Sequence, residues 1–184
     1  KVHAAPRVGI ISLGTELVAP RNVPARGQIR DSNSSALMAE ALDAGAEPVF
    51  YGIAPDDEQA IAELVHRAVQ ECDFVITSGG ASAGDYDYVT ALVKREGEVL
   101  FDLGGKPYLG LSGNPAAAYV GFEMLARPAI RKMRGFAEGA RPVQQATLTH
   151  GVKKRQPRRF FDRATVLRDP ETGELLVTEA KSQN

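Results

Sequence analysis

The sequence predicts an α/β protein in three layers, a mostly parallel sheet with helices on both faces, followed by a small β domain. Short apolar runs alternate with segments of helical periodicity through most of the chain, and this alternation is typical of parallel strands joined by crossover helices. After Gly135 the pattern changes to strand-type alternation. We therefore expect an α/β domain over residues 1–137 and a small β domain, incomplete in this sequence, over residues 138–184.

The bulk composition excludes several classes of protein. The 184 residues are 43% apolar and 24% charged with a formal net charge of -1, which gives no electrostatic argument for binding nucleic acid or a membrane surface. The single cysteine, Cys72, excludes an internal disulfide and a cysteine metal cluster. No apolar run approaches the roughly 20 residues of a membrane helix. We expect a cytoplasmic protein that binds neither nucleic acid nor membranes.

The first half of the chain reads as two strand, loop and helix units. The first has a strand over residues 7–12, Glu16 in the loop beyond it, and a helix from Ser32 or Asn33 to Gly45. Its expected buried face is Leu37, Met38, Ala41 and Leu42.

The second unit has a strand over residues 48–53 and a helix over 58–71, with Asp56 or Asp57 as the helix cap. A third strand over residues 74–76 then opens the loop Thr77–Val89, in which Gly79 and Gly80 precede Asp85 and Asp87. This loop is either an active-site loop or a solvent-exposed turn whose aspartates cap the helix expected at 87–95.

In the second half, strands are expected at residues 98–101 and 106–111, joined by a link that is long enough only for a hairpin. A loop of small residues, 112–115, then leads into one long helix with Pro115 in its first turn. Its apolar face is Ala118, Val120, Phe122, Leu125, Ile130 and Met133. The β domain has expected strands at 143–148, 160–167 and 175–179, and residues 169–173 form a hairpin turn.

The loops after the strands are expected to form one site, because parallel strands end at the same edge of their sheet. Loops rich in glycine and serine can bind phosphate through backbone N–H groups, and the carboxylates of Glu16, Asp56, Asp85 and Asp87 can hold Mg²⁺. This combination indicates chemistry at a phosphoanhydride. No Gly-Lys-Ser/Thr phosphate loop and no Gly-x-Gly-x-x-Gly fingerprint follows the first strand, so nucleoside triphosphatases and dehydrogenases are disfavoured.

The assembled motifs resemble the MoeA family of molybdopterin molybdenumtransferases, which is related to the gephyrin E domain and has a MoaB/MogA-like molybdopterin-binding fold. Nearly the whole chain resembles the C-terminal half of that family. The motifs are Ser12-Leu-Gly-Thr-Glu-Leu17, Gly27-Gln-Ile-Arg-Asp-Ser-Asn33, Pro55-Asp-Asp57, Ser78-Gly-Gly-Ala-Ser-Ala-Gly-Asp-Tyr-Asp-Tyr88 and Gly110-Leu-Ser-Gly-Asn-Pro115.

The resemblance implies an enzyme that inserts molybdenum from molybdate into molybdopterin and hydrolyses the adenylylated pterin with the help of Mg²⁺. Glu16, Asp56 and Asp87 fall on the family's functional acids, and Asp56 and Asp87 would be the metal ligands. The residues expected to bind the pterin substrate are Ser78, Gly79, Gly80, Ser82, Ser112, Gly113, Asn114 and Pro115. The resemblance further implies a homodimer that works with a MogA-type adenylyltransferase and with molybdoenzyme apoproteins.

Three departures from the family pattern are visible. Thr15 stands where the family commonly has Asp, and Ser112 replaces the first proline of a Leu-Pro-Gly-Asn-Pro loop. The family's Lys-Pro-Gly-Lys-Pro loop, which would bind anionic substrate, has no counterpart between Phe101 and Asp102. Either the protein has lost this loop, or a segment of the natural chain is absent here, which is the explanation we favour. Lys106, in the following strand, is a poor substitute.

Two other functions remain open at the level of sequence. One is a module that binds molybdopterin or a nucleotide without turnover, or serves as a scaffold in the way that gephyrin does. The other is a nucleotide pyrophosphatase resembling CinA, which the motifs Arg30-Asp31-Ser32 and Gly113-Asn114-Pro115 disfavour.

Overall fold

The computed structural model describes residues 3–80, 97–98, 102–153 and 161–180. The chain divides into two compact units, Lys1–Ala140 and Arg141–Asn184. The helix expected at 87–95 lies outside the described residues. None of the helices in the described part of the chain is long and apolar enough to cross a membrane.

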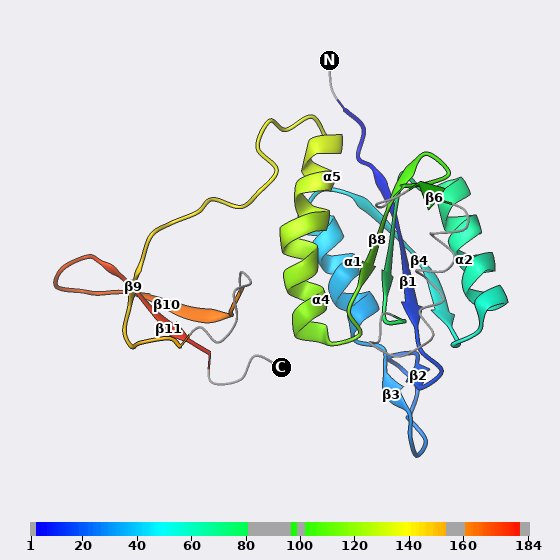
Figure 1. The fold of residues 1–184 in the computed structure, drawn as a ribbon, viewed down its shortest axis with the longest axis horizontal. Helices are drawn as coiled ribbons and strands as arrows, with labels where there is room; N and C mark the ends of the chain where they lie inside the picture. Colours follow the sequence, from blue (N-terminus) through cyan, green and yellow to red (C-terminus); the bar gives the residue numbers. More distant parts are fainter. Residues whose placement is uncertain (1–2, 81–96, 99–101, 154–160, 181–184) are drawn as a thin grey trace. The chain divides into compact units, whose positions relative to one another are not determined.

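The first unit is built on a six-stranded sheet in the order β4-β1-β5-β8-β7-β6 (Figure 1). Its four longer strands are parallel to one another: β1 (Arg7–Leu13), β4 (Glu47–Ala54), β5 (Phe74–Ser78) and β8 (Lys106–Leu111). The predicted mostly parallel sheet is therefore confirmed, and the carboxyl ends of four strands meet at one edge.

The strands before β8 differ from the hairpin that was predicted between residues 98–101 and 106–111. The link between residues 98 and 106 contains a strand of its own, β7 (Asp102–Leu103), which pairs antiparallel with β8 through a turn at Gly104 and Gly105. Its other edge pairs antiparallel with β6 (Gly97–Glu98). The junction at Phe101, where the family's lysine loop has no counterpart, lies outside the described residues.

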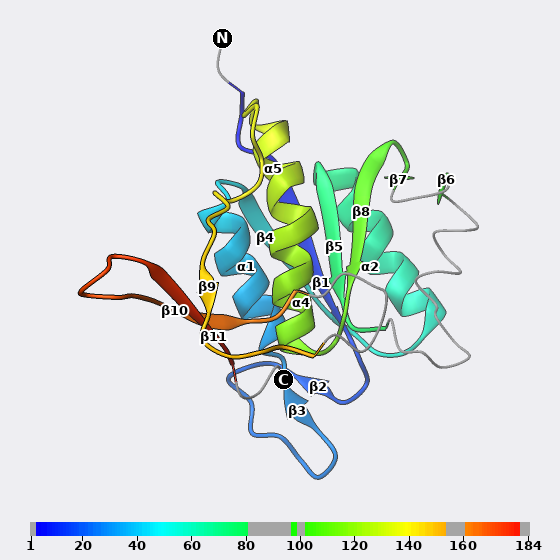
Figure 2. The ribbon, with the colours of Figure 1, turned by 60° about the vertical axis from the view of Figure 1, so that its left-hand side comes forward.

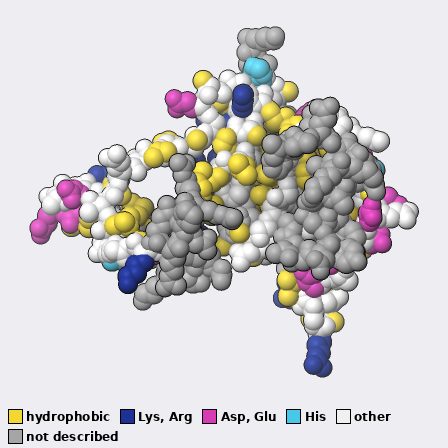
Figure 3. All heavy atoms as spheres, viewed as in Figure 1, with side chains coloured by type: hydrophobic (Ala, Val, Ile, Leu, Met, Phe, Trp, Pro, Cys, Tyr) yellow, Lys and Arg dark blue, Asp and Glu magenta, His cyan; other side chains and the backbone are white. Residues whose placement is uncertain are grey.

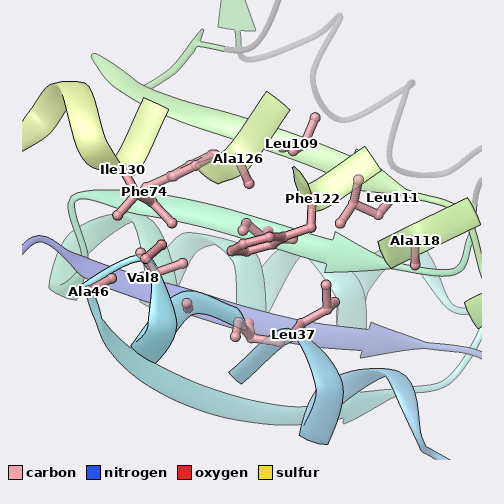
Figure 4. Packing of buried hydrophobic residues seen from close by; sticks show 14 residues of the cluster. Val8, Leu37, Ala46, Phe74, Leu109, Leu111, Ala118, Phe122, Ala126 and Ile130 are labelled. Carbon is pink, nitrogen blue, oxygen red and sulfur yellow. The ribbon is translucent and has the colours of Figure 1, made fainter. Parts of the chain in front are cut away.

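Helices cover both faces of this sheet (Figure 2). One face is covered by α1 (Asn33–Asp43), α4 (Pro115–Gly121) and α5 (Arg127–Met133), and the other by α2 (Glu58–Glu71). Each face has a hydrophobic cluster of its own. Figure 4 shows the larger cluster, in which the Phe122 side chain points from the helical layer toward the sheet. The predicted three-layer arrangement is confirmed.

The two predicted helix starts are capped differently. At α1, Ser32 holds the N-cap position but its side chain makes no capping bond, and Asp31 Oδ1 instead accepts from Ser34 N at 3.0 Å. At α2, Asp57 is the cap, and its Oδ1 accepts from Ala60 N at 2.9 Å. The sequence left Asp56 and Asp57 as equal candidates, and the structure frees Asp56 for another role.

The long helix expected after Pro115 is interrupted by a π-helical turn, Phe122–Ala126, between α4 and α5. A π turn has more residues per turn than an α-helix and rotates the following side chains around the axis. Leu125, expected on the buried face, is 56% exposed, whereas Ala126 is buried. Leu42 of α1 was also expected inside but is 61% exposed.

A short parallel pair, β2 (Leu17–Val18) with β3 (Ile29–Arg30), closes the excursion between them. The excursion projects beyond the carboxyl ends of the strands at the bottom of Figure 1, and in Figure 3 its far end carries Lys or Arg side chains. Arg21 and Arg26 are the exposed basic residues of this segment.

The second unit contains a small sheet in the order β10-β11-β9, formed by β9 (Thr147–Leu148), β10 (Ala164–Arg168) and β11 (Leu175–Glu179). The hairpin turn predicted at residues 169–173 is confirmed, because β10 and β11 pair antiparallel around it. Asp169 accepts from the backbone N–H groups of Thr172 and Glu171, and these bonds hold the pKa of Asp169 below its ordinary value. The strand expected over 143–148 is limited to β9.

Candidate active site

A cavity of about 670 Å³ lies where the loops after β1, β4, β5 and β8 meet. It brings together most of the residues that the sequence singled out. The lining residues are Ser12, Leu13, Gly14, Glu16, Leu17, Ile29, Arg30, Asp31, Ser32, Asn33, Asp56, Ser78, Gly79, Gly80, Ser112, Gly113, Asn114 and Pro115. The predicted Ser82 and Asp87, together with Asp85, lie outside the described residues.

Asp56 is held in place by Thr15 across the loops that follow β1 and β4. The hydroxyl and the backbone N–H of Thr15 donate to Asp56 Oδ2 at 3.2 and 3.3 Å, and Asp56 N donates to Thr15 Oγ1 at 3.0 Å. An aspartate at position 15 would face Asp56 with a second negative charge. Threonine therefore orients this carboxylate, which gives the departure at position 15 a structural reason.

The loop after β5 approaches its neighbours closely at Gly79. Gly79 has φ +92°, and a Cβ atom there would lie 2.2 Å from the carbonyl oxygen of Leu13. Gly79 N donates to Leu111 O at 3.0 Å. Only glycine fits this position, because any side chain would displace the β1 backbone.

Asn114, in the loop after β8, satisfies the first backbone donors of α4. Asn114 Oδ1 accepts from Ala116 N at 3.0 Å and Ala117 N at 3.2 Å, and Asn114 N donates to Ser112 Oγ at 3.1 Å. These N–H groups were expected to face an anion, and the Asn114 cap uses them instead. In the loops that the structure describes, Gly80 and Gly113 keep N–H groups available to a ligand.

The predicted site residues did not include those of the segment 29–33, which follows the excursion and also lines the cavity. Arg30 is the only Lys or Arg side chain among the described lining residues, and its Nε donates to Asn22 O at 3.1 Å. Lys106 does not line the cavity, since its Nζ donates to Cys72 O at 2.7 Å at the other end of β8. Arg30 could have been selected from its position shortly before a predicted helix, because the chain comes back to the edge of the sheet there.

Two buried polar atoms in the cavity wall make no hydrogen bond with the protein. Ser12 Oγ and Asp31 Oδ2 belong to side chains that are each 1% exposed. Buried polar groups in proteins nearly always have a partner, so these two atoms mark hydrogen-bonding capacity that the fold itself does not use. Ser12 lies in β1, and Asp31 lies between β3 and α1.

The donor set of the cavity suits a hard cation. Glu16 and Asp56 supply carboxylate oxygens, and no group of three His, Cys, Asp or Glu side chains arranged for a metal occurs among the described residues. Mg²⁺ is usually held by one or two carboxylates together with substrate phosphates. The described side chains therefore fit a cation shared with a phosphorylated ligand rather than an all-protein metal cage.

The chain was compared with known families and proteins. Residues 9–132 match the model of a family described as a probable molybdopterin binding domain. The molybdopterin molybdenumtransferase of Nostoc sp. is 40% identical over 168 residues, which are 82% of this chain and 38% of that protein. The enzyme of the same name from Bacillus subtilis is 36% identical over 188 residues, 94% of this chain and 43% of that protein.

Solved structures resemble the chain in the same way. A molybdopterin biosynthesis moeA protein from Pyrococcus horikoshii superposes with a TM-score of 0.75 at 30% identity, covering 97% of this chain and 46% of that one. A MoaB protein from Pyrococcus furiosus, at 19% identity and a TM-score of 0.55, covers 71% of this chain and 96% of its own, and shows the shared fold. The chain spans about two fifths of the length of the curated relatives that it matches.

Proposed function

The chain belongs to the probable molybdopterin binding domain family, and from that premise we propose that it is the molybdopterin-binding part of a molybdopterin molybdenumtransferase. The reaction would insert molybdenum from molybdate into molybdopterin while adenylylated molybdopterin is hydrolysed and AMP leaves. The names of the relatives from Nostoc and Bacillus support this proposal.

The observation that carries the proposal is the composition of the cavity. Three carboxylates, Glu16, Asp31 and Asp56, share it with the glycine and serine loops 78–80 and 112–115. Its volume of about 670 Å³ is within the usual range for sites that bind a small molecule or cofactor. Acidic and phosphate-binding elements in one cavity suit a phosphoanhydride substrate that binds with a divalent cation.

In this proposal the acidic residues hold the cation, and the basic and N–H groups bind phosphate. Asp56, oriented by Thr15, would hold Mg²⁺ together with Asp87, and the cation would neutralise negative charge on the phosphoanhydride oxygens. Glu16 is the third functional acid. Arg30 and the N–H groups of Gly80 and Gly113 would bind the phosphate oxygens, since these are the donors that the loops leave available.

The partners follow from the reaction. A MogA-type adenylyltransferase would supply the adenylylated pterin, and molybdoenzyme apoproteins would receive the finished cofactor. A homodimer in the cytoplasm belongs to the same proposal. The chain spans about two fifths of its relatives, so in this proposal the rest of the full-length protein completes the site.

The test is a calorimetric titration of adenylylated molybdopterin into the protein with and without Mg²⁺. We expect binding that Mg²⁺ strengthens, and an Asp56→Asn variant that loses at least about tenfold in the Mg²⁺-dependent affinity, since even outer-shell partners of a metal site are typically worth that much. Asp57→Asn is the matched control. Asp57 follows the same strand but caps α2, and asparagine caps a helix about as well as aspartate.

Turnover is tested on the full-length protein by AMP release in the presence of molybdate. Tight binding without AMP release would favour a binding module. Cleavage of ADP-ribose in place of adenylylated molybdopterin would favour the pyrophosphatase. Equal affinities of the wild type and Asp56→Asn would remove Asp56 from the site.

A further inference from the structure

A single side-chain amide connects the two small-residue loops of the cavity. Asn33 is the first residue of α1 and is half-buried. Its Nδ2 donates to Ser78 Oγ at 2.7 Å and to Gly113 O at 3.0 Å. Ser78 ends β5, and Gly113 lies in the loop after β8. One nitrogen from the helix layer therefore bonds to the ends of two adjacent strands.

The network around Asn33 extends through both loops. Ser78 Oγ donates onward to Ser112 O at 3.2 Å, and the backbone of the same two loops is joined by the bond from Gly79 N to Leu111 O. On the helix side, the bond from Ser34 N to Asp31 Oδ1 fixes the first turn of α1. Asn33 thus lies between a fixed helix start and two loops that have few other connections to α1.

We propose that Asn33 is a positioning residue that sets the spacing of the loops 78–80 and 112–115 for the phosphate-bearing part of the ligand. This inference rests on the proposed function, because that function is what places phosphate oxygens between the loops. Displacing a binding group by about 1 Å can lower a rate about 100-fold, so a bond that fixes two such loops has consequences beyond stability.

The chemistry of the bond requires a neutral group with two N–H donors on one short side chain. Aspartate has the same shape but would set a carboxylate against the carbonyl oxygen of Gly113. Alanine removes both bonds. The Asn33→Asp and Asn33→Ala variants therefore both release the loops, by repulsion in one case and by loss of contact in the other.

Lys106→Met provides the matched control. Lys106 is also half-buried, and its Nζ donates to two carbonyl oxygens, Cys72 O at 2.7 Å and Gln70 O at 3.5 Å. It joins elements at the opposite edge of the same sheet, where β8 begins. The control removes a comparable pair of bonds without touching the cavity.

The first measurement is hydrogen exchange of backbone amides in the wild type and the three variants. In both Asn33 variants we expect exchange at Gly79 and Asn114, whose N–H groups are hydrogen-bonded, to accelerate about tenfold, the effect of losing a typical hydrogen bond to a partly buried group. Lys106→Met should leave these amides as in the wild type. Unchanged exchange in the Asn33 variants, or equal acceleration in Lys106→Met, would overturn the inference.

The second measurement is the affinity for AMP with Mg²⁺, by calorimetry on the same four proteins. We expect about a tenfold loss in both Asn33 variants and none in Lys106→Met. If the loops loosen and the affinity stays the same, Asn33 does not position them for binding and the inference fails. If wild-type protein binds neither AMP nor adenylylated molybdopterin, the proposed function fails, and the exchange data alone decide whether Asn33 sets the loops.

Discussion

Arg127 is the centre of a cluster of ion pairs between α1 and the π turn. Its side chain is 3% exposed, and its Nη2 lies 2.6 Å from Glu40 Oε2, 2.7 Å from Glu123 Oε1 and 3.0 Å from Asp43 Oδ2. Glu40 and Glu123 are mostly buried, whereas Asp43 is 62% exposed. The Arg127 guanidinium therefore balances the charge of two enclosed carboxylates.

Replacing Arg127 by methionine should lower the free energy of unfolding by roughly 3–5 kcal/mol, because it leaves buried carboxylates without their cation. Urea denaturation measures the loss. Arg131→Met is the control, since Arg131 stacks on Phe136 at a more exposed position of α5. A loss below about 1 kcal/mol, the usual value of a surface ion pair, would show that the cluster is solvated.

Glu40 makes the stability of the same cluster depend on pH. Burial, and then its hydrogen bond with Glu123, raise the pKa of Glu40 above the ordinary value of 4.5. The folded protein therefore binds this proton more tightly than the unfolded chain does. Its contribution to stability is complete below pH 4.5 and is lost as the pH rises through the raised pKa.

Glu40→Gln removes that titration. Relative to the wild type, the variant should gain stability as the pH rises from about 4 to 7, and urea denaturation across that range gives the difference. The comparison within one pair of proteins cancels the other carboxylates. A difference that stays flat, or that favours the wild type increasingly with pH, would mean that the attraction of Arg127 outweighs the burial of Glu40.

At the scale of elements, the π turn decides which residues of the α4 to α5 segment face the sheet. An unbroken α-helix would place Leu125 on the same face as Phe122. The wider turn moves Arg127 inward and Leu125 outward, while Ala126 stays buried. Phe122 remains fully buried, so the change of phase begins after it.

This arrangement predicts unequal costs for the same substitution. Leu37→Ala, in the buried face of α1, should cost about 2–5 kcal/mol, whereas Leu125→Ala should cost less than about 1 kcal/mol. Chemical denaturation of the two variants measures the contrast. Similar losses would indicate that Leu125 is buried and that the helix is continuous.

At the scale of the whole molecule, every described residue that lines the cavity falls between Ser12 and Pro115, within the unit Lys1–Ala140. Both hydrophobic clusters also lie within that unit. Because compact units with their own core are able to fold alone, the cavity does not depend on residues 141–184 for its described walls.

A chain ending at Ala140 should therefore unfold cooperatively and bind AMP with Mg²⁺ with an affinity within about threefold of that of the full 184-residue chain. Thermal unfolding and calorimetry test the two parts of this expectation. Loss of cooperative unfolding would mean that the second unit supports the first. Loss of binding alone would mean that residues beyond 140 contribute to the site.

Much of the architecture was open to prediction because it depends on local patterns. Four parallel strands and α2 occur where the periodicity of apolar residues put them, since a buried face selects apolar residues with the period of its element. The errors have local causes of another kind. The π turn, the strand β7 inside a presumed link, and the cap by Asp31 are each set by particular hydrogen bonds, which the periodicity of apolar residues does not register.

The sequence by itself determined the fold class, the edge of the sheet at which the loops meet, and the residue types gathered there, because strand direction and loop composition are set along the chain. Only the tertiary structure decided which acid caps a helix and which faces the cavity, because Asp56 and Asp57 are neighbours and differ only in what lies across from them: Thr15 for one and Ala60 N for the other. The tertiary structure likewise connected Asn33 to the loops of the cavity, since its hydrogen bonds to residues 45 and 80 positions away have no trace in local sequence.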